Sequence, residues 1–121
     1  MREFKYTILE LIQFCLRHRR NKVFKGWTPQ QIGWGIERAI NHKGFAMAIG
    51  EDGNLAGVCL STPDHAAKVL HVHDVLCVRR GALSAMLIKC REWYPGYQIT
   101  ARRRGKMVSY RTERLLGLFK A

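Results

Sequence analysis

The residues best suited to moving a proton lie in the apolar segment 69–78. His71 and His73 are two positions apart in it, and its valine content predicts a β-strand. Residues two apart in a strand share a face, so both imidazoles are expected on one face of the sheet and Asp74 on the other. An imidazole titrates near neutral pH, which suits it to take the proton of an ammonium group before that nitrogen attacks. The alternatives are a packing role, or a metal site that takes a third ligand from elsewhere.

The segment after this strand has the composition of a phosphate site. It contains Arg79, Arg80 and Gly81, and apolar residues at helical spacing from Leu83 onward predict a helix that starts directly afterwards. The first backbone N–H groups of a helix have no partner within it, and together with the helix dipole they attract phosphate. The alternative is a glycine that only starts the helix. The candidate phosphate-binding residues are Val78, Arg79, Arg80, Gly81, Ala82 and Ser84.

A second basic cluster is predicted in a strand-to-helix turn and consists of Arg102, Arg103, Arg104 and Lys106. Guanidinium groups bind phosphate in a bidentate manner, so this run is expected to grip the phosphates of a cofactor or to contact the backbone of a nucleic acid. A run that only solvates the surface is the third interpretation.

The net charge of +12 is concentrated at the two ends of the chain. Residues 1–26 carry seven Lys or Arg against two acidic residues, and residues 79–121 carry eleven against two, whereas residues 27–78 carry three against five. Such a field attracts an anionic partner, which is a nucleic acid, the phosphates of a cofactor or an acidic protein surface.

Periodicity places these candidates on a single α/β domain that spans residues 1–121, a length that suits one core. Helices are predicted from apolar residues at helical spacing and from the capping signal Thr28-Pro29, and a hairpin from short apolar runs on either side of Asp52-Gly53. A strand–helix–strand unit normally pairs its strands in parallel. The expected elements are helices 6–20 and 28–41, strands 44–50, 55–61 and 69–78, helix 83–94, strand 97–101 and a last helix 107–119.

The sequence also argues against several classes of protein. No stretch of about 18 apolar residues occurs, so we expect no membrane span. Cys15, Cys59, Cys77 and Cys90 are far apart in the chain and form no CxxC pair. We therefore expect free, mostly buried thiols, no bound metal and a cytoplasmic location.

The order of these elements, with the strand HVHDVLCV and the following RRGALSAML, resembles the GNAT superfamily of acyl-CoA N-acyltransferases. The resemblance covers residues 44–119. The family signature is Gln or Arg, two residues, Gly, one residue, then Gly or Ala. One register starts at Arg79 and has Ala82 and Ser84 at the small positions, and the other aligns Gly81 with the first glycine and places Val78 at the basic position.

This resemblance implies a GNAT-like fold of order α-α-β-β-β-α-β-α that binds acetyl-CoA at residues 78–84. It further implies transfer of an acetyl group to an amine, with His71 or His73 as general base. Tyr110, near the start of the last helix, falls where the family has a general acid for the departing thiolate. The alternative for Tyr110 is packing within that helix.

In this family a further strand usually closes the substrate side, whereas here the sequence stops at Ala121. The resemblance thus implies an open site completed by a partner or by a second copy in a homodimer, or a fold kept for binding alone. The second hypothesis is a non-catalytic GNAT-like basic protein, encoded by a phage or mobile element, that binds nucleic acid or another acidic macromolecule through its basic ends. A structural or inhibitory partner of an acidic complex is the third.

Overall fold

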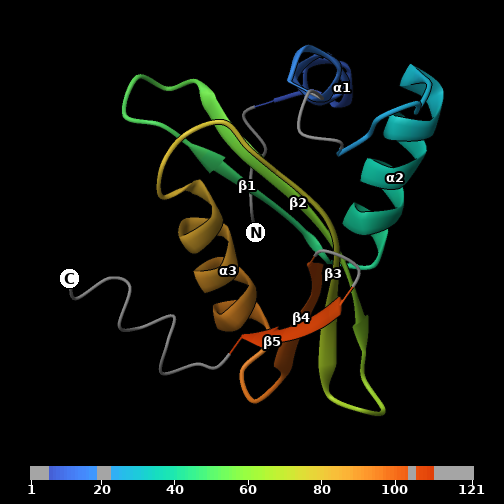
Figure 1. Cartoon of the computed structure of the whole chain (residues 1–121), viewed down its shortest axis with the longest axis vertical. Helices are drawn as coiled ribbons and strands as arrows, with labels where there is room; N and C mark the ends of the chain where they lie inside the picture. The colour runs from blue at the N-terminus through green and yellow to red at the C-terminus, as the bar shows by residue number, and fades with distance from the viewer. Residues whose placement is uncertain (1–5, 19–22, 104–105, 111–121) are drawn as a thin grey trace.

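The structure is a computed structural model that describes residues 6–18, 23–103 and 106–110, with the backbone alone for 102–103 and 106–110. Figure 1 shows α1 and α2 on one side of the sheet and α3 on the other. In chain order the elements are α1 Ile8–Arg17, α2 Pro29–Asn41, β1 Phe45–Ile49, β2 Leu55–Asp64, β3 Val69–Cys77, α3 Ala82–Trp93, β4 Gln98–Arg103 and β5 Lys106–Tyr110.

The first two helices each begin with a reciprocal capping box. Thr7 Oγ1 accepts a hydrogen bond from the backbone N–H of Glu10, whose carboxylate accepts one from the backbone N–H of Thr7. Thr28 and Gln31 make the same pair of bonds at α2, where proline occupies the first position. Side-chain caps satisfy N–H groups that the helix cannot pair, and each contributes about 1 kcal/mol. The start of α2 predicted from its capping signal is confirmed.

The described strands form one mixed sheet in the order β1-β2-β3-β4-β5. β1, β2 and β3 are antiparallel neighbours, β4 lies parallel to β3 after the crossover through α3, and β5 returns antiparallel to β4. The predicted antiparallel run of three strands and the predicted parallel pair are confirmed, and so is the mixed α/β class.

The sheet separates two apolar cores. Leu11, Ile36 and Val58 belong to the core beneath α1 and α2, whereas Leu70 and Met86 belong to the core beneath α3. The four cysteines are free thiols, as expected, and all but the half-buried Cys77 are buried. No described helix combines the length and the apolar composition that crossing a membrane requires.

A β-bulge interrupts the pairing of β2 with β3. Leu60 faces Asp74 and the next residue, Ser61, faces Val72, so His73 is an extra residue on β3. A bulge of this kind bends its strand and increases the local twist.

β3 and β4 diverge directly after this bulge. Their last paired residues are Val72 and Ala101, although β3 continues to Cys77 and β4 continues to Arg103. From His73 to Cys77, no described strand pairs with the edge of β3 that faces away from β2.

The predicted last helix is wrong over the part that the structure describes. Residues 106–110 form β5, in which Lys106 pairs with Arg103 and Tyr110 with Ile99. The β-branched and aromatic residues of MVSY favour an extended backbone, and β4 offers them an edge to pair with, which periodicity within one segment does not reveal. Residues 111–119 of the predicted helix lie outside the described residues.

Gly44 joins α2 to β1 and lies so close to Ser61 of β2 that no side chain fits between them. A Cβ at this position would lie 1.9 Å from the carbonyl oxygen of Ser61. We expect Gly44→Ala to lower the free energy of unfolding by roughly 3 kcal/mol or more, because the backbone at Gly44 or at Ser61 must move to make room for the methyl group. Urea unfolding measures the loss.

The control is Gly53→Ala in the β1–β2 turn, where φ is +82° and no atom lies within 4 Å of the added Cβ. That variant carries only the strain of a left-handed backbone, about 1–2 kcal/mol. Equal losses in the two variants would contradict the close approach at Gly44.

Candidate functional site

The bulge changes which face of β3 carries Asp74. Val72 and Val75 both contact the core beneath α3 although they are three residues apart, so the alternation of faces slips by one residue between them. His71 and Asp74 therefore both lie on the face toward α1 and α2. The expectation that Asp74 faces away from His71 is wrong, because the extra residue at position 73 shifts the alternation.

Each histidine is anchored by a threonine of a neighbouring strand. His71 Nδ1 lies 2.9 Å from Thr100 Oγ1 on β4, and His73 Nε2 lies 2.7 Å from Thr62 Oγ1 on β2. His71 is half-buried, whereas His73 is exposed. Because Thr62 is the register partner of His71, the two histidines sit side by side on this face. The two imidazoles share a face, as predicted, but no sequence pattern indicates their threonine partners.

Asp74 is a half-buried acid beside these histidines. Burial raises the pKa of its carboxyl, and the charge of His73 opposes that rise only in part. Burial also raises the pKa of the Cys15 thiol on α1 to about 12, and the negative charge of Asp74 contributes to that shift. Asp74 thus lies close enough to α1 to influence a buried group there.

The loop between β3 and α3 is tied to the β1–β2 turn. Both terminal guanidinium nitrogens of Arg79 donate to the carboxylate of Asp52, with Nη1 at 2.9 Å. This bond lowers the pKa of Asp52 to about 2 and raises the pKa of Arg79. Arg79, predicted to hold phosphate, is therefore engaged by a carboxylate that the sequence analysis did not assign to the site.

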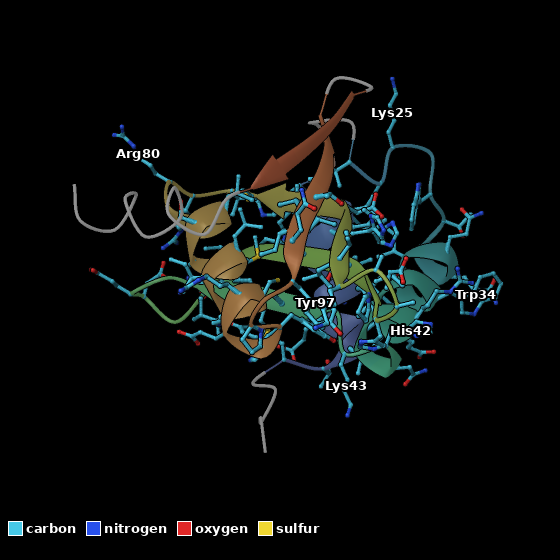
Figure 2. The ribbon with its side chains drawn as sticks, turned by 90° about the horizontal axis from the view of Figure 1, so that it is seen from below. Lys25, Trp34, His42, Lys43, Arg80 and Tyr97 are labelled. Carbon is cyan, nitrogen blue, oxygen red and sulfur yellow. The ribbon has the colours of Figure 1, made fainter. Side chains whose placement is uncertain are left out.

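The other predicted loop residues differ in their exposure. Val78 is half-buried against the core beneath α1 and α2, and its N–H donates to Ala56. Ala82 is buried and Ser84 is half-buried, so α3 contributes backbone more than side chain here. Arg80 is exposed, and Figure 2 shows its side chain extending away from the fold.

The start of α3 lacks the side-chain cap that α1 and α2 have. Gly81 occupies the N-cap position with a left-handed backbone, φ +86°, and no side chain accepts from the first turn. A glycine tolerates this φ without strain. The N–H of Ala82 donates to the carbonyl oxygen of Arg79 at 3.3 Å, so the N–H groups available to a ligand are those of Leu83 and Ser84, which no side chain caps.

A cavity of about 510 Å³ adjoins the same loop from the side of α1. One face of α1 lines it, including Glu10, Phe14 and Arg17, and Val78 and Arg79 close its far wall. The sequence predicted no cavity there, because α1 and the end of β3 are about 60 residues apart and only the folded sheet brings them together.

The second basic cluster lies in a hairpin and not in the predicted strand-to-helix turn. In the described backbone, Arg102 pairs with Met107 and Arg103 with Lys106, both beyond the last β3–β4 pair. The tip of β4 and β5 is therefore a two-stranded ribbon that extends past the rest of the sheet, as Figure 2 shows. Arg104 lies outside the described residues.

Tyr110, predicted on the last helix, ends β5 instead. Its backbone lies opposite Ile99, in the same row as Leu70, two rows from the point where β3 and β4 separate. Among the described residues no three His, Cys, Asp or Glu side chains gather as metal ligands.

No protein-family model, curated protein or solved structure significantly matches the chain.

The raised pKa of Asp74 predicts how stability changes with pH. Below about pH 3 the carboxyl is neutral in both states, and native stability falls as the pH rises from the unfolded pKa, about 3.9, to the higher folded pKa, because the unfolded chain releases its proton first. We expect the melting temperature of Asp74→Asn minus that of the parent protein to increase between about pH 4 and pH 7. Thermal melts at several pH values measure the difference.

Asp52→Asn provides a comparison of opposite sign. The pKa of Asp52 is lowered to about 2 by its bonds to Arg79, so its contribution is present above the unfolded pKa and is lost in acid. This variant should be less stable than the parent at neutral pH and approach it as the pH falls. An Asp74→Asn variant that behaves in the same direction as Asp52→Asn would contradict the buried position of Asp74.

Proposed function

We propose that the chain is an acyl-CoA-dependent N-acyltransferase that transfers an acetyl group to an amine. The observation that carries this proposal is the divergence of β3 from β4 after Val72 and Ala101, beside the bulge at His73. It leaves an open edge on β3, and this edge leads directly to the start of α3, where no side chain caps the helix. A GNAT-like fold is part of the same proposal, and the order of the first seven elements supports it.

The open edge of β3 suits the pantetheine arm of acyl-CoA. This arm is extended and carries two amide groups, and the edge of a strand presents backbone N–H and C=O groups in alternation. An extended ligand with amides can add to such an edge as another strand would. The edge from His73 to Cys77 therefore supplies main-chain partners along the arm.

The start of α3 suits the pyrophosphate of the same ligand. Backbone N–H groups of a first turn, concentrated by the helix dipole, bind phosphate, and Gly81 allows close approach because it has no side chain. Arg80 adds a positive charge at the rim. Arg79 does not contact the phosphates in this proposal; its bonds to Asp52 hold the loop between β3 and α3 in position.

His73 is our candidate for the general base. It is exposed, it sits at the bulge where the thioester end of an arm along β3 would lie, and its bond to Thr62 fixes the ring. It takes one proton from the ammonium group of the acceptor, and the freed lone pair attacks the thioester carbonyl carbon. His71, which is half-buried and bonded to Thr100, is the second candidate.

The remaining steps need little from the protein. The C–N bond forms as the carbonyl becomes tetrahedral, and the C–S bond breaks as the carbonyl returns. The nitrogen then gives its second proton to water, and the thiolate leaves as an anion whose conjugate thiol has a pKa of about 8.5. Water can supply the proton that the thiolate takes up near neutral pH, so Tyr110 is not required as an acid. Its place on β5, away from the divergence, favours this simpler route.

Binding of nucleic acid is the second candidate function, and the β4–β5 ribbon favours it. Arg102, Arg103 and Lys106 lie in a two-stranded ribbon that extends beyond the sheet. A β-ribbon fits the major groove of a duplex, and cations on it would pair with phosphates. The net charge of +12 supports an anionic macromolecular partner.

Gly81 and Gly96 provide a matched pair to test acyl-CoA binding. They flank α3 with φ values of +86° and +82°, and neither would place an added Cβ within 4 Å of another atom. Both valine variants therefore carry similar backbone strain. We expect Gly81→Val to weaken acetyl-CoA binding by about tenfold or more, because its side chain would block the phosphate site, and Gly96→Val to leave affinity unchanged. Calorimetric titration measures both.

His73→Gln separates binding from chemistry in the same experiment. The amide keeps a polar contact to Thr62, so we expect parental affinity for acetyl-CoA with loss of acetyl transfer to a panel of amines. Absence of acetyl-CoA binding by the parent protein at millimolar concentration would overturn the enzyme proposal. Equal losses in the two glycine variants would overturn the placement at α3.

The ribbon candidate predicts strong dependence of duplex binding on salt. Each phosphate contact adds about 0.9 to the slope of log affinity against log salt for a duplex, so Arg102→Gln with Arg103→Gln should reduce that slope by about 1.8. Fluorescence anisotropy with a labelled duplex measures it. A flat salt response of the parent, or an unchanged slope in the variant, would exclude the ribbon as the contact.

A further inference from the structure

A cluster of aromatic and basic residues lies at the end of β3 opposite the α3 loop. Tyr94 and Tyr97 follow α3, His65 belongs to the β2–β3 turn, and Lys68 immediately precedes β3. Neither the proposed acyl-CoA site nor the ribbon tip uses these residues. We call the cluster the aromatic–basic patch, and its members are His42, Lys43, His65, Lys68, Tyr94 and Tyr97.

The three rings of the patch contact one another. The ring centroids of Tyr94 and Tyr97 are 5.1 Å apart, and the ring of His65 lies 5.9 Å from that of Tyr97 and 6.2 Å from that of Tyr94. His65 Nδ1 and the Tyr97 hydroxyl are 2.6 Å apart. Both tyrosines are half-buried and His65 is exposed, so the rings are fixed in place while part of their surface meets solvent.

Two exposed lysines have backbone carbonyl groups that are bonded to the segment containing these rings. The Tyr94 hydroxyl donates to the carbonyl oxygen of Lys43 at 2.8 Å, and the N–H of Gln98, next to Tyr97, donates to the carbonyl oxygen of Lys68 at 3.0 Å. Both lysines have left-handed backbones, with φ of 60° and 55°. Figure 2 shows the Lys43 side chain extending away from the fold.

Left-handed backbone at lysine is unfavourable, and glycine or asparagine would fit better at both positions. The chain nevertheless has a cation at each of them, so fold stability does not explain the choice of residue. Asp64, the acidic residue that ends β2, accepts a hydrogen bond from the N–H of Ala67. The patch thus combines three rings in mutual contact with two exposed lysines whose backbones are bonded to the same segment, at Tyr94 and Gln98.

We propose that the aromatic–basic patch binds single-stranded nucleic acid, with bases against the rings and phosphates at Lys43 and Lys68. Rings that stack on bases and cations that follow the backbone are the combination by which single strands are bound without sequence preference. A duplex hides the faces of its bases, so the rings would add nothing to duplex binding. This proposal is independent of acyl transfer and of the ribbon.

The test is fluorescence anisotropy of the full chain with a labelled single strand of about 12 nucleotides, a length within the usual site size of such proteins. Lys43→Gly with Lys68→Gly removes both charges and relieves both backbones, so the fold is preserved. We expect the dissociation constant to rise by about tenfold and the slope of log affinity against log salt to fall by about 1.4, since each single-strand phosphate contact contributes about 0.7.

Arg17→Gln with Lys25→Gln is the control, because it removes two exposed charges outside the patch. We expect it to change affinity by less than about threefold. Tyr97→Phe keeps the ring and should bind like the parent, whereas Tyr97→Ala should not. Equal losses in the patch and control variants, or unchanged binding in the patch variant, would overturn the proposal. Preference of the parent for a duplex would overturn it in favour of the ribbon.

Discussion

The contact between Gly44 and Ser61 is the constraint on which the rest of the structure depends. The backbone N–H of Ser61 and its hydroxyl both donate to the carbonyl oxygen of Gly44, at 2.9 and 2.6 Å. Ser61 is the one buried polar residue of the described core, and these bonds satisfy its hydroxyl. The contact fixes the end of α2 and the start of β1 against the middle of β2.

The register of the sheet changes at this same residue. Ser61 pairs with Val72, and the bulge at His73 begins directly beside that pair. Val72 pairs in turn with Ala101, which is the last pair before β3 and β4 separate. One row across the sheet therefore sets the position of the bulge, the face that Asp74 occupies and the point where the strand edge opens.

The two ends of β3 present different chemistry as a result. Its last residues lead into a tight loop clamped by Arg79 and Asp52, with backbone groups available at an open edge and a helix start. Its first residues adjoin the aromatic–basic patch, in which His65 is bonded to Tyr97 and the Tyr94 hydroxyl donates to the backbone carbonyl oxygen of Lys43. A small anionic ligand suits the first arrangement because backbone N–H groups lie at the helix start, and a single strand suits the second because rings and lysines lie together there.

The sequence by itself determined the elements that local physics controls. The capping box at Thr28, the amphipathic stripes of α1 and α2 and the turn at Gly53 depend on residues close together in the chain, and the structure contains all of them. Tertiary structure decided the rest, because strand edges and bulges depend on partners far along the chain. Residues 106–110, predicted to begin the last helix, form β5 because they pair with β4. The extra residue at the bulge places Asp74 on the same face as His71, and Arg79 forms an ion pair with Asp52. Hydrogen bonds across a sheet have no period within a single segment, so no local pattern could reveal them.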